Sequence, residues 1–262
     1  MKLILSFLFA IVNFAANAQK QALVKQLNSF IPKGFGLKDT AFGDLNNDGK
    51  MDVAFAIYSL KEDNEAFEDT AMNMSRPLLL LIQQPDGKLK LAKRNNNLIM
   101  CKQCGGGMGD PFESLLIKKN SVILSFYGGS SWRWGDTYGF SWDATIQTWR
   151  LTKEDHTSFQ GGDPEATTKN TIIPASEIAN FNFDNFNINT LSGPGAVTAK
   201  VTAVKCFFYN APNTATKRKA YVMKGDTINI VREYLTYYDT YFTNAKGQVS
   251  TGYVLKKDVE KQ

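Results

Sequence analysis

The chain has 262 residues and a formal net charge of +5, from 30 Lys and Arg against 25 Asp and Glu. This small positive excess gives no indication of nucleic-acid binding. The single His argues against cysteine peptidases, zinc amidases and serine hydrolases, because all of them use His as a base or as a metal ligand.

The first 18 residues have the pattern of a secretory signal peptide. Lys2 precedes the apolar stretch LILSFLFAIVNF, and Ala16-Asn17-Ala18 has the small-x-small form of a cleavage site. The apolar stretch is short for a bilayer span, and no later stretch is long enough for one. We therefore expect a mature chain that begins at Gln19, has no transmembrane segment, and is periplasmic or secreted, where nucleic acid is rarely met.

An amphipathic helix is predicted over residues 20–31, because its apolar side chains recur at helical spacing. Pro32 and Gly34 end it. The residues expected on its apolar face are Leu23, Val24, Leu27, Phe30 and Ile31.

The run FGDLNNDGKMDVAFAI at residues 42–57 has the spacing of a calcium-binding loop. The expected metal ligands are the side chains of Asp44, Asn46, Asp48 and Asp52 and the backbone carbonyl of Lys50. Gly49 stands where such a loop turns sharply, but Phe55 replaces the bidentate Glu of an EF-hand, and a strand follows instead of a helix. We expect a structural calcium site between two strands. The alternative is a turn that the Asp and Asn side chains cap themselves.

Period-two alternation predicts antiparallel strands in the middle of the chain. These strands are 51–59, 77–84, 88–92, two strands within 113–127 around Lys119-Asn120, and a hairpin of 137–143 with 146–152. Two buried faces are expected, one of Val122, Leu124 and Phe126 and one of Tyr138, Phe140 and Trp142. The polar segment 61–75 is expected to be a loop or a short helix.

Glycine, proline and polar residues mark 160–175 and 190–197 as linkers. Between them, an aromatic segment is expected to attach a last strand to the preceding domain through Phe181, Phe183, Phe186 and Ile188. The sequence thus predicts a mainly β protein. A signal peptide (1–18) is followed by an antiparallel β domain with an N-terminal helix (19–190) and a second set of strands (198–262).

The three cysteines suggest one local disulfide. Cys101 and Cys104 form a CxxC before three glycines, and a zinc site would need more ligands than Cys206 and His156 can add. In an oxidising compartment we expect a Cys101–Cys104 bridge, with Cys206 as a buried free thiol.

Aromatic residues are the candidate ligand-binding side chains: Trp132, Trp134, Tyr234, Tyr238 and Tyr253. Exposed aromatic rings stack on sugars and extended peptides. Tyr237 and Tyr241 are candidates for the same groove in the tail. The alternative is that the tryptophans fill the sheet core and that half of the tyrosines are core or cross-strand residues.

Paired carboxylates are the remaining candidate for chemistry. Asp110 and Glu113, or Asp136 and Asp143, would serve glycoside hydrolysis if two of them faced one sugar. The alternative is a carboxylate bonded to nearby backbone amides or paired with Arg133. His156, in KEDHTSF, is expected in a solvated turn, so no catalytic residue is assigned.

Several of these segments resemble known families. The block GDLNNDGKMDVAF resembles one Asp-rich turn of the FG-GAP or VCBS repeats, which build calcium-binding β-propellers in exported and adhesive proteins. The pieces IPKGF, RPLLLLIQQPDGKLKL, CKQCGGGMGDPFE and FYGGSSWRWGDTYGF, with the Asp-rich block, resemble a family of exported bacterial proteins. That resemblance covers most of residues 20–160 and implies one coherent domain.

The tail, residues 198–262, is similar to bacterial SH3-like small barrels, with Gly252-Tyr253-Val254 in place of the family's Gly-Trp-Ile or Gly-Trp-Val. The resemblance implies binding to cell-wall peptides or to other proteins. We therefore expect an exported, non-catalytic binding protein of the cell envelope. A glycan-active hydrolase that uses paired carboxylates, and an immunity or inhibitor protein, are the alternatives.

Overall fold

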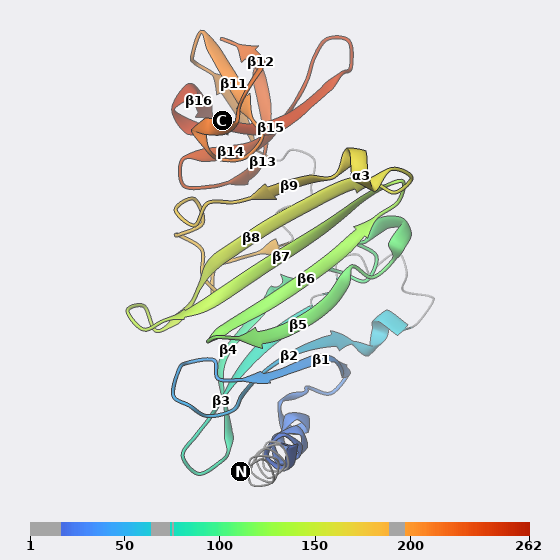
Figure 1. The fold of residues 1–262 in the computed structure, drawn as a ribbon, viewed down its shortest axis with the longest axis vertical. Coiled ribbons are helices and arrows are strands. Elements are labelled where there is room, and N and C mark those ends of the chain that lie inside the picture. Colours follow the sequence, from blue (N-terminus) through green and yellow to red (C-terminus); the bar gives the residue numbers. More distant parts are fainter. Residues whose placement is uncertain (1–16, 64–73, 75, 189–196) are drawn as a thin grey trace, which may run out of the picture.

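The computed structural model describes residues 17–63, 74, 76–188 and 197–262. These residues form three antiparallel β-sheets, with a helix at residues 17–27 beneath the first sheet (Figure 1). The prediction of a mainly β, antiparallel fold with an N-terminal helix is therefore confirmed. Nearly all of the predicted signal peptide and of the 190–197 linker lies outside the described residues, as does most of 61–75.

The first sheet is a meander of four strands in the order β1-β2-β3-β4. Its strands are β1 (Phe35–Gly43), β2 (Asp52–Ser59), β3 (Arg76–Gln83) and β4 (Leu89–Ile99). Three short 3-10 turns precede or follow its strands, η1 (Asn28–Phe30), η2 (Leu60–Asp63) and η4 (Gly106–Met108). The central strands β2 and β3 are buried on both faces, which explains their nearly continuous apolar sequences.

The two faces of the first sheet pack against different partners. Helix residues Leu23 and Leu27 are buried against Phe55 and Leu79 on one face. On the other face, Ala54 and other small or aliphatic side chains join the core of the second sheet. Val24, predicted on the apolar face of the helix, is 45% exposed, so the buried stripe is narrower than predicted.

The second sheet has five strands in the order β5-β6-β7-β8-β9. They are β5 (Phe112–Lys118), β6 (Ser121–Gly129), β7 (Trp132–Asp143), β8 (Thr148–Gln160) and β9 (Lys169–Ile172). The tight turn between β5 and β6 places Lys119 and Asn120 at positive φ, the geometry of a two-residue hairpin loop. The predicted buried faces are present: all their residues except the half-buried Trp142 are fully buried.

Two predictions for the end of this domain are wrong. The segment 160–175 is not a linker, since it contains the short helix α3 (Pro164–Thr167) and the edge strand β9. The segment 181–188 is not a strand and makes only one isolated bridge, Asn182 to Arg150. Its apolar residues nevertheless fill the core, because Phe183 and Phe186 pack edge-on against Phe140.

The third sheet forms the C-terminal module (residues 197–262), which curls at one end of the molecule (Figure 1). Its strand order is β12-β11-β15-β14-β13-β10-β16. Its elements are β10 (Thr198–Val201), β11 (Lys205–Tyr209), η6 (Thr214–Thr216), β12 (Lys217–Met223), β13 (Thr227–Glu233), β14 (Tyr237–Thr243), β15 (Val249–Leu255), η7 (Lys256–Asp258) and β16 (Val259–Lys261). Its identity as an SH3-like barrel stays a prediction.

Candidate functional site

The Asp-rich loop connects β1 to β2. Carboxylate oxygens of Asp44, Asp48 and Asp52 lie within 4.8 Å of one another, so these three residues could hold a metal ion. Gly49 has a φ of +80°, which the sharp turn of the loop requires and which residues with a Cβ rarely adopt. The spacing in the sequence thus brings the acidic ligands together.

The same loop also satisfies its own hydrogen bonds. Asp44 Oδ2 accepts from the Gly49 amide at 2.8 Å, and the Lys50 ammonium lies 3.0 Å from Asp48 Oδ2. Asp52 is fully buried and accepts from two backbone amides. Burial, with added repulsion from Asp48 and Asp44, raises the pKa of Asp52 to about 6. A cation among these carboxylates would favour their ionised forms.

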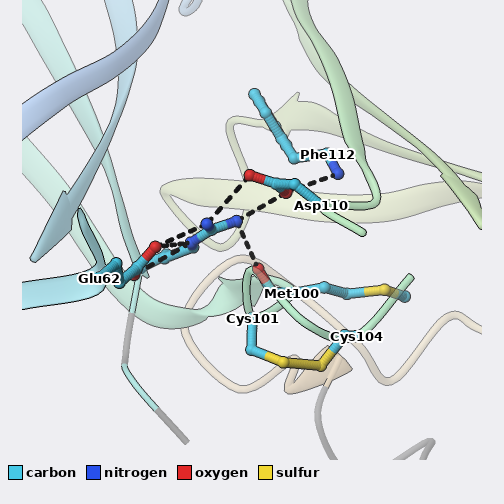
Figure 2. The surroundings of a disulfide bond; sticks show 7 residues. Glu62, Met100, Cys101, Cys104, Asp110 and Phe112 are labelled. Atoms are coloured by element: carbon cyan, nitrogen blue, oxygen red, sulfur yellow. Dashed lines mark hydrogen bonds and ion pairs between the residues drawn. A yellow bond between two sulfur atoms is a disulfide. The ribbon is translucent and has the colours of Figure 1, made fainter. Parts of the chain in front are cut away.

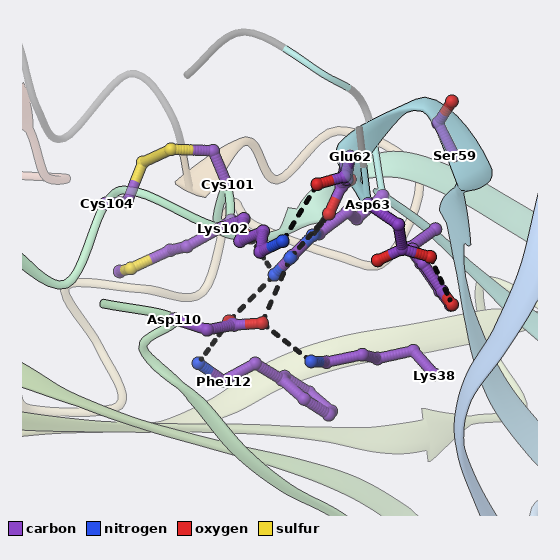
Figure 3. A network of polar contacts seen from close by, with 12 residues as sticks. Lys38, Ser59, Glu62, Asp63, Cys101, Lys102, Cys104, Asp110 and Phe112 are labelled. Atoms are coloured by element: carbon purple, nitrogen blue, oxygen red, sulfur yellow. Dashed lines mark hydrogen bonds and ion pairs between the residues drawn. A yellow bond between two sulfur atoms is a disulfide. The ribbon is translucent and has the colours of Figure 1, made fainter. Parts of the chain in front are cut away.

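A second charged cluster centres on Arg76, which is on β3 and is buried. Figure 2 shows how its partners Glu62, Met100 and Asp110 lie around one point. Its guanidinium lies between two carboxylates: Nη2 is 2.6 Å from Glu62 Oε2, and Nη1 is 2.8 Å from Asp110 Oδ1. Nη1 also donates to the Met100 carbonyl. Lys38 reaches the other oxygen of Asp110 at 2.6 Å (Figure 3). Each charge therefore has an opposite charge beside it.

This cluster limits what Asp110 can do. Burial opposes its ionisation, but hydrogen bonds from Arg76 and Lys38 outweigh burial and hold the pKa of Asp110 below its usual value. A carboxylate that stays ionised at neutral pH cannot donate a proton as a general acid. Its partner is Arg76 rather than the Arg133 considered in the sequence, and Glu113, on β5, is exposed.

The loop that supplies Asp110 also contains the two clustered cysteines. The sulfur atoms of Cys101 and Cys104 lie at disulfide distance, 2.15 Å, beside the Arg76 cluster (Figure 2). The pair is therefore placed as the predicted bridge requires. Cys206 is a fully buried free thiol, and burial raises its pKa to about 12.

A third polar cluster surrounds His156, and the sequence did not indicate it. His156 is in the middle of β8 and not in a solvated turn, so that prediction is wrong. Its Nδ1 lies 2.8 Å from Asp136 on β7, and its Nε2 lies 2.9 Å from Glu154, which is on β8 like His156 itself. Although burial disfavours the charged ring, these hydrogen bonds raise the pKa of His156 to about 10. The raised pKa favours the protonated imidazole at neutral pH.

The C-terminal module completes this cluster. Arg232 Nη1 and the Tyr234 hydroxyl both donate to Glu154 Oε1, from positions 78 and 80 residues away in the chain. Glu154 is fully buried, and Arg232 is 7% exposed. Arg232 also lies over the rings of Phe181 and Phe186. Glu154 and Arg232 are on two different sheets, and no motif in the sequence connects them, so only the tertiary fold brings them together.

The candidate ligand-binding aromatic residues are distributed over several environments. Trp132 is 55% exposed, whereas Trp134 is partly buried and packs against the main core. Tyr234 and Tyr238 are buried, so the prediction that they line an open groove is wrong. Tyr253 is largely buried but lines a cavity, as Tyr241 does.

This cavity of about 620 Å³ lies between β9 and the C-terminal module. Besides the two tyrosines, its lining includes Lys169, Arg218 and Asp239. A second cavity of about 570 Å³ shares Lys169 and Asn210 with it and continues along β9. Both have the size of small-molecule sites in proteins.

No family model matches the chain, and neither the curated proteins nor the solved structures include a significant match. Among the residues that the structure describes, no helix is both long and apolar enough to cross a membrane. The function must therefore be inferred from the residues themselves.

Proposed function

We propose that this chain is an exported, non-catalytic binding protein of the bacterial cell envelope. Its C-terminal module would contact a wall peptide or an envelope protein, and calcium in the Asp44–Asp52 loop would stabilise the N-terminal domain. The signal-peptide pattern supports export. The SH3-like pattern of the tail supports binding through the C-terminal module, and the Asp-rich spacing supports the calcium site.

One observation carries the choice of binding over catalysis. The single imidazole lies between Asp136 and Glu154, and its hydrogen bonds to these two carboxylates raise its pKa to about 10. A pKa raised in this way favours the protonated ring, which cannot accept a proton as a general base. Of the acids considered for glycoside hydrolysis, Asp110 pairs with Arg76 and Asp143 pairs with Arg150. The cavity between β9 and the C-terminal module offers aromatic and polar surface for binding.

The test uses the full mature chain with purified cell-wall sacculi. We expect the protein to sediment with the sacculi without releasing soluble wall fragments over many hours. If the protein releases soluble wall fragments and the Glu113→Gln variant does not, the function is glycan hydrolysis and not binding. Failure to sediment, together with no partner among cross-linked envelope proteins, would overturn the proposed binding role.

A further inference from the structure

The cavity between β9 and the C-terminal module has an acidic group on its lining. Asp239, on β14, lines the cavity; Arg232 is its cross-strand partner on β13, and the charges of His156 and Glu154 also act on it. In the part of the chain that the structure describes, no side chain donates a hydrogen bond to the Asp239 carboxylate. Asp239 is therefore the member of the His156 cluster that is left for a ligand to pair with.

The charges of this cluster do not balance. Three carboxylates, those of Asp136, Glu154 and Asp239, face two cations, His156 and Arg232, so the fully ionised cluster carries one net negative charge. A buried uncompensated charge is costly and favours an opposite charge nearby. Of these three carboxylates only Asp239 lines the cavity, so a cation that enters from solvent would pair with Asp239.

The other lining residues suit a ligand that also carries a negative group. Tyr209, Tyr241 and Tyr253 present aromatic surface, which attracts an ammonium group through the ring faces. Arg218 uses Nη1 on the Thr251 carbonyl, and its other guanidinium nitrogens remain available to a carboxylate. Lys169, on the edge strand β9, adds a second positive charge.

We propose that this cavity binds a small zwitterion, namely a free amino acid or the end of a short peptide, with its ammonium group on Asp239 and its carboxylate near Arg218 and Lys169. This inference rests on the proposed function only in treating the chain as a binding protein. It names the class of ligand and does not require that the ligand come from the wall.

Ligand binding should depend on pH through Asp239. Burial raises the pKa of this carboxyl to about 6, although His156 and Arg232 partly offset that effect. The groups around it are Asp136 and Tyr138 on β7, Glu154 and His156 on β8, Arg232 on β13, Tyr234 just after β13, and Tyr253 on β15. An ammonium ligand needs the ionised carboxylate, so affinity should be about tenfold weaker at pH 5 than at pH 7.

The experiment is calorimetric titration of the full mature chain with three matched probes: the dipeptide alanylalanine, its N-acetyl form and its C-terminal amide. We expect alanylalanine to bind, the amide to bind more weakly, and the N-acetyl form not to bind. Asp239→Asn should weaken alanylalanine at least tenfold. Asp86→Asn, at an exposed turn acid outside the cavity, is the matched control and should change nothing.

Arg218→Met provides a second test if Asp239→Asn unfolds: it should weaken alanylalanine but leave the amide unchanged. Equal binding of all three probes, no binding at millimolar concentration, or unchanged affinity in Asp239→Asn would overturn the inference. Sedimentation with sacculi is measured on the same preparations. Sedimentation without dipeptide binding would refute only the zwitterion site, and dipeptide binding without sedimentation would refute only the envelope-wall role.

Discussion

Replacing Arg76 with Met tests the charged cluster between β3 and the disulfide loop. The Arg76 side chain is 1% exposed and bonds both oxygens of Glu62, whose side chain is also 1% exposed. Without the guanidinium, the buried Glu62 carboxylate would lose the one side-chain ion pair it makes among the described residues, since Lys102 bonds its backbone carbonyl instead. Asp110 would be less affected, because it is 24% exposed and keeps Lys38 and the Phe112 amide.

Removing one partner of a buried ion pair costs about 3–5 kcal/mol, because the other charge is left uncompensated. We therefore expect Arg76→Met to lower the free energy of unfolding by that amount, measured as the shift of the urea midpoint. The double variant Arg76→Met, Glu62→Leu removes both charges and should recover most of the loss. Lys88→Met is the control, since its pair with Asp86 is solvent-exposed and is worth less than about 1 kcal/mol.

The comparison between these variants shows whether the loss of stability comes from an unpaired buried charge. If Arg76→Met costs no more than Lys88→Met, the interior charges do not interact as strongly as their geometry indicates. If the double variant is as unstable as the single one, the loss comes from packing of the arginine side chain and not from an unpaired Glu62.

Three further predictions follow from the sites described above. Calcium should raise the melting temperature of the mature chain in calorimetry, and Asp48→Ala should remove this gain. If calcium does not shift the melting temperature of the unaltered protein, the metal site is refuted. Alkylation in denaturant should modify one thiol without reductant and three thiols with reductant. The folded, unreduced protein should stay unmodified, because Cys206 is buried. Three reactive thiols before reduction would exclude the bridge. Asp239 holds its proton more tightly when folded, since burial raises its pKa from 3.8 to about 6, so its ionisation lowers stability as pH rises through that window. The free energy of unfolding of Asp239→Asn, relative to that of the unaltered protein, should thus rise by about 1–3 kcal/mol between pH 4 and pH 7 in urea titrations. A difference between the two proteins that stays constant over this pH range would contradict the prediction.

Local patterns in the sequence were sufficient for the hairpins and for the acidic loop. Alternation in VILSF and the turn at Lys119-Asn120 specify β5 and β6, because side-chain direction and turn geometry act over a few residues. The carboxylates of Asp44, Asp48 and Asp52 converge because nine consecutive residues contain the whole turn. In such cases short-range chemistry determines the structure.

The features that the sequence did not reveal depend on contacts between distant segments. β1 has only one fully buried residue, Ala41, so its alternation is weak and the strand was not predicted. β9 is polar and exposed, and it forms a strand because it adds to the edge of β8. The surroundings of His156 require the β7–β8 register and a contact 78 residues away with Arg232, which no local pattern specifies.

The junction between the C-terminal module and β8 has a mechanical consequence. Tyr209, Tyr234, Tyr237 and Tyr253 of the module belong to the same apolar core as the second sheet, and Arg232 is bonded to Glu154 inside it. Separating the module from the second sheet would therefore require breaking the Arg232–Glu154 ion pair and exposing this shared core to water.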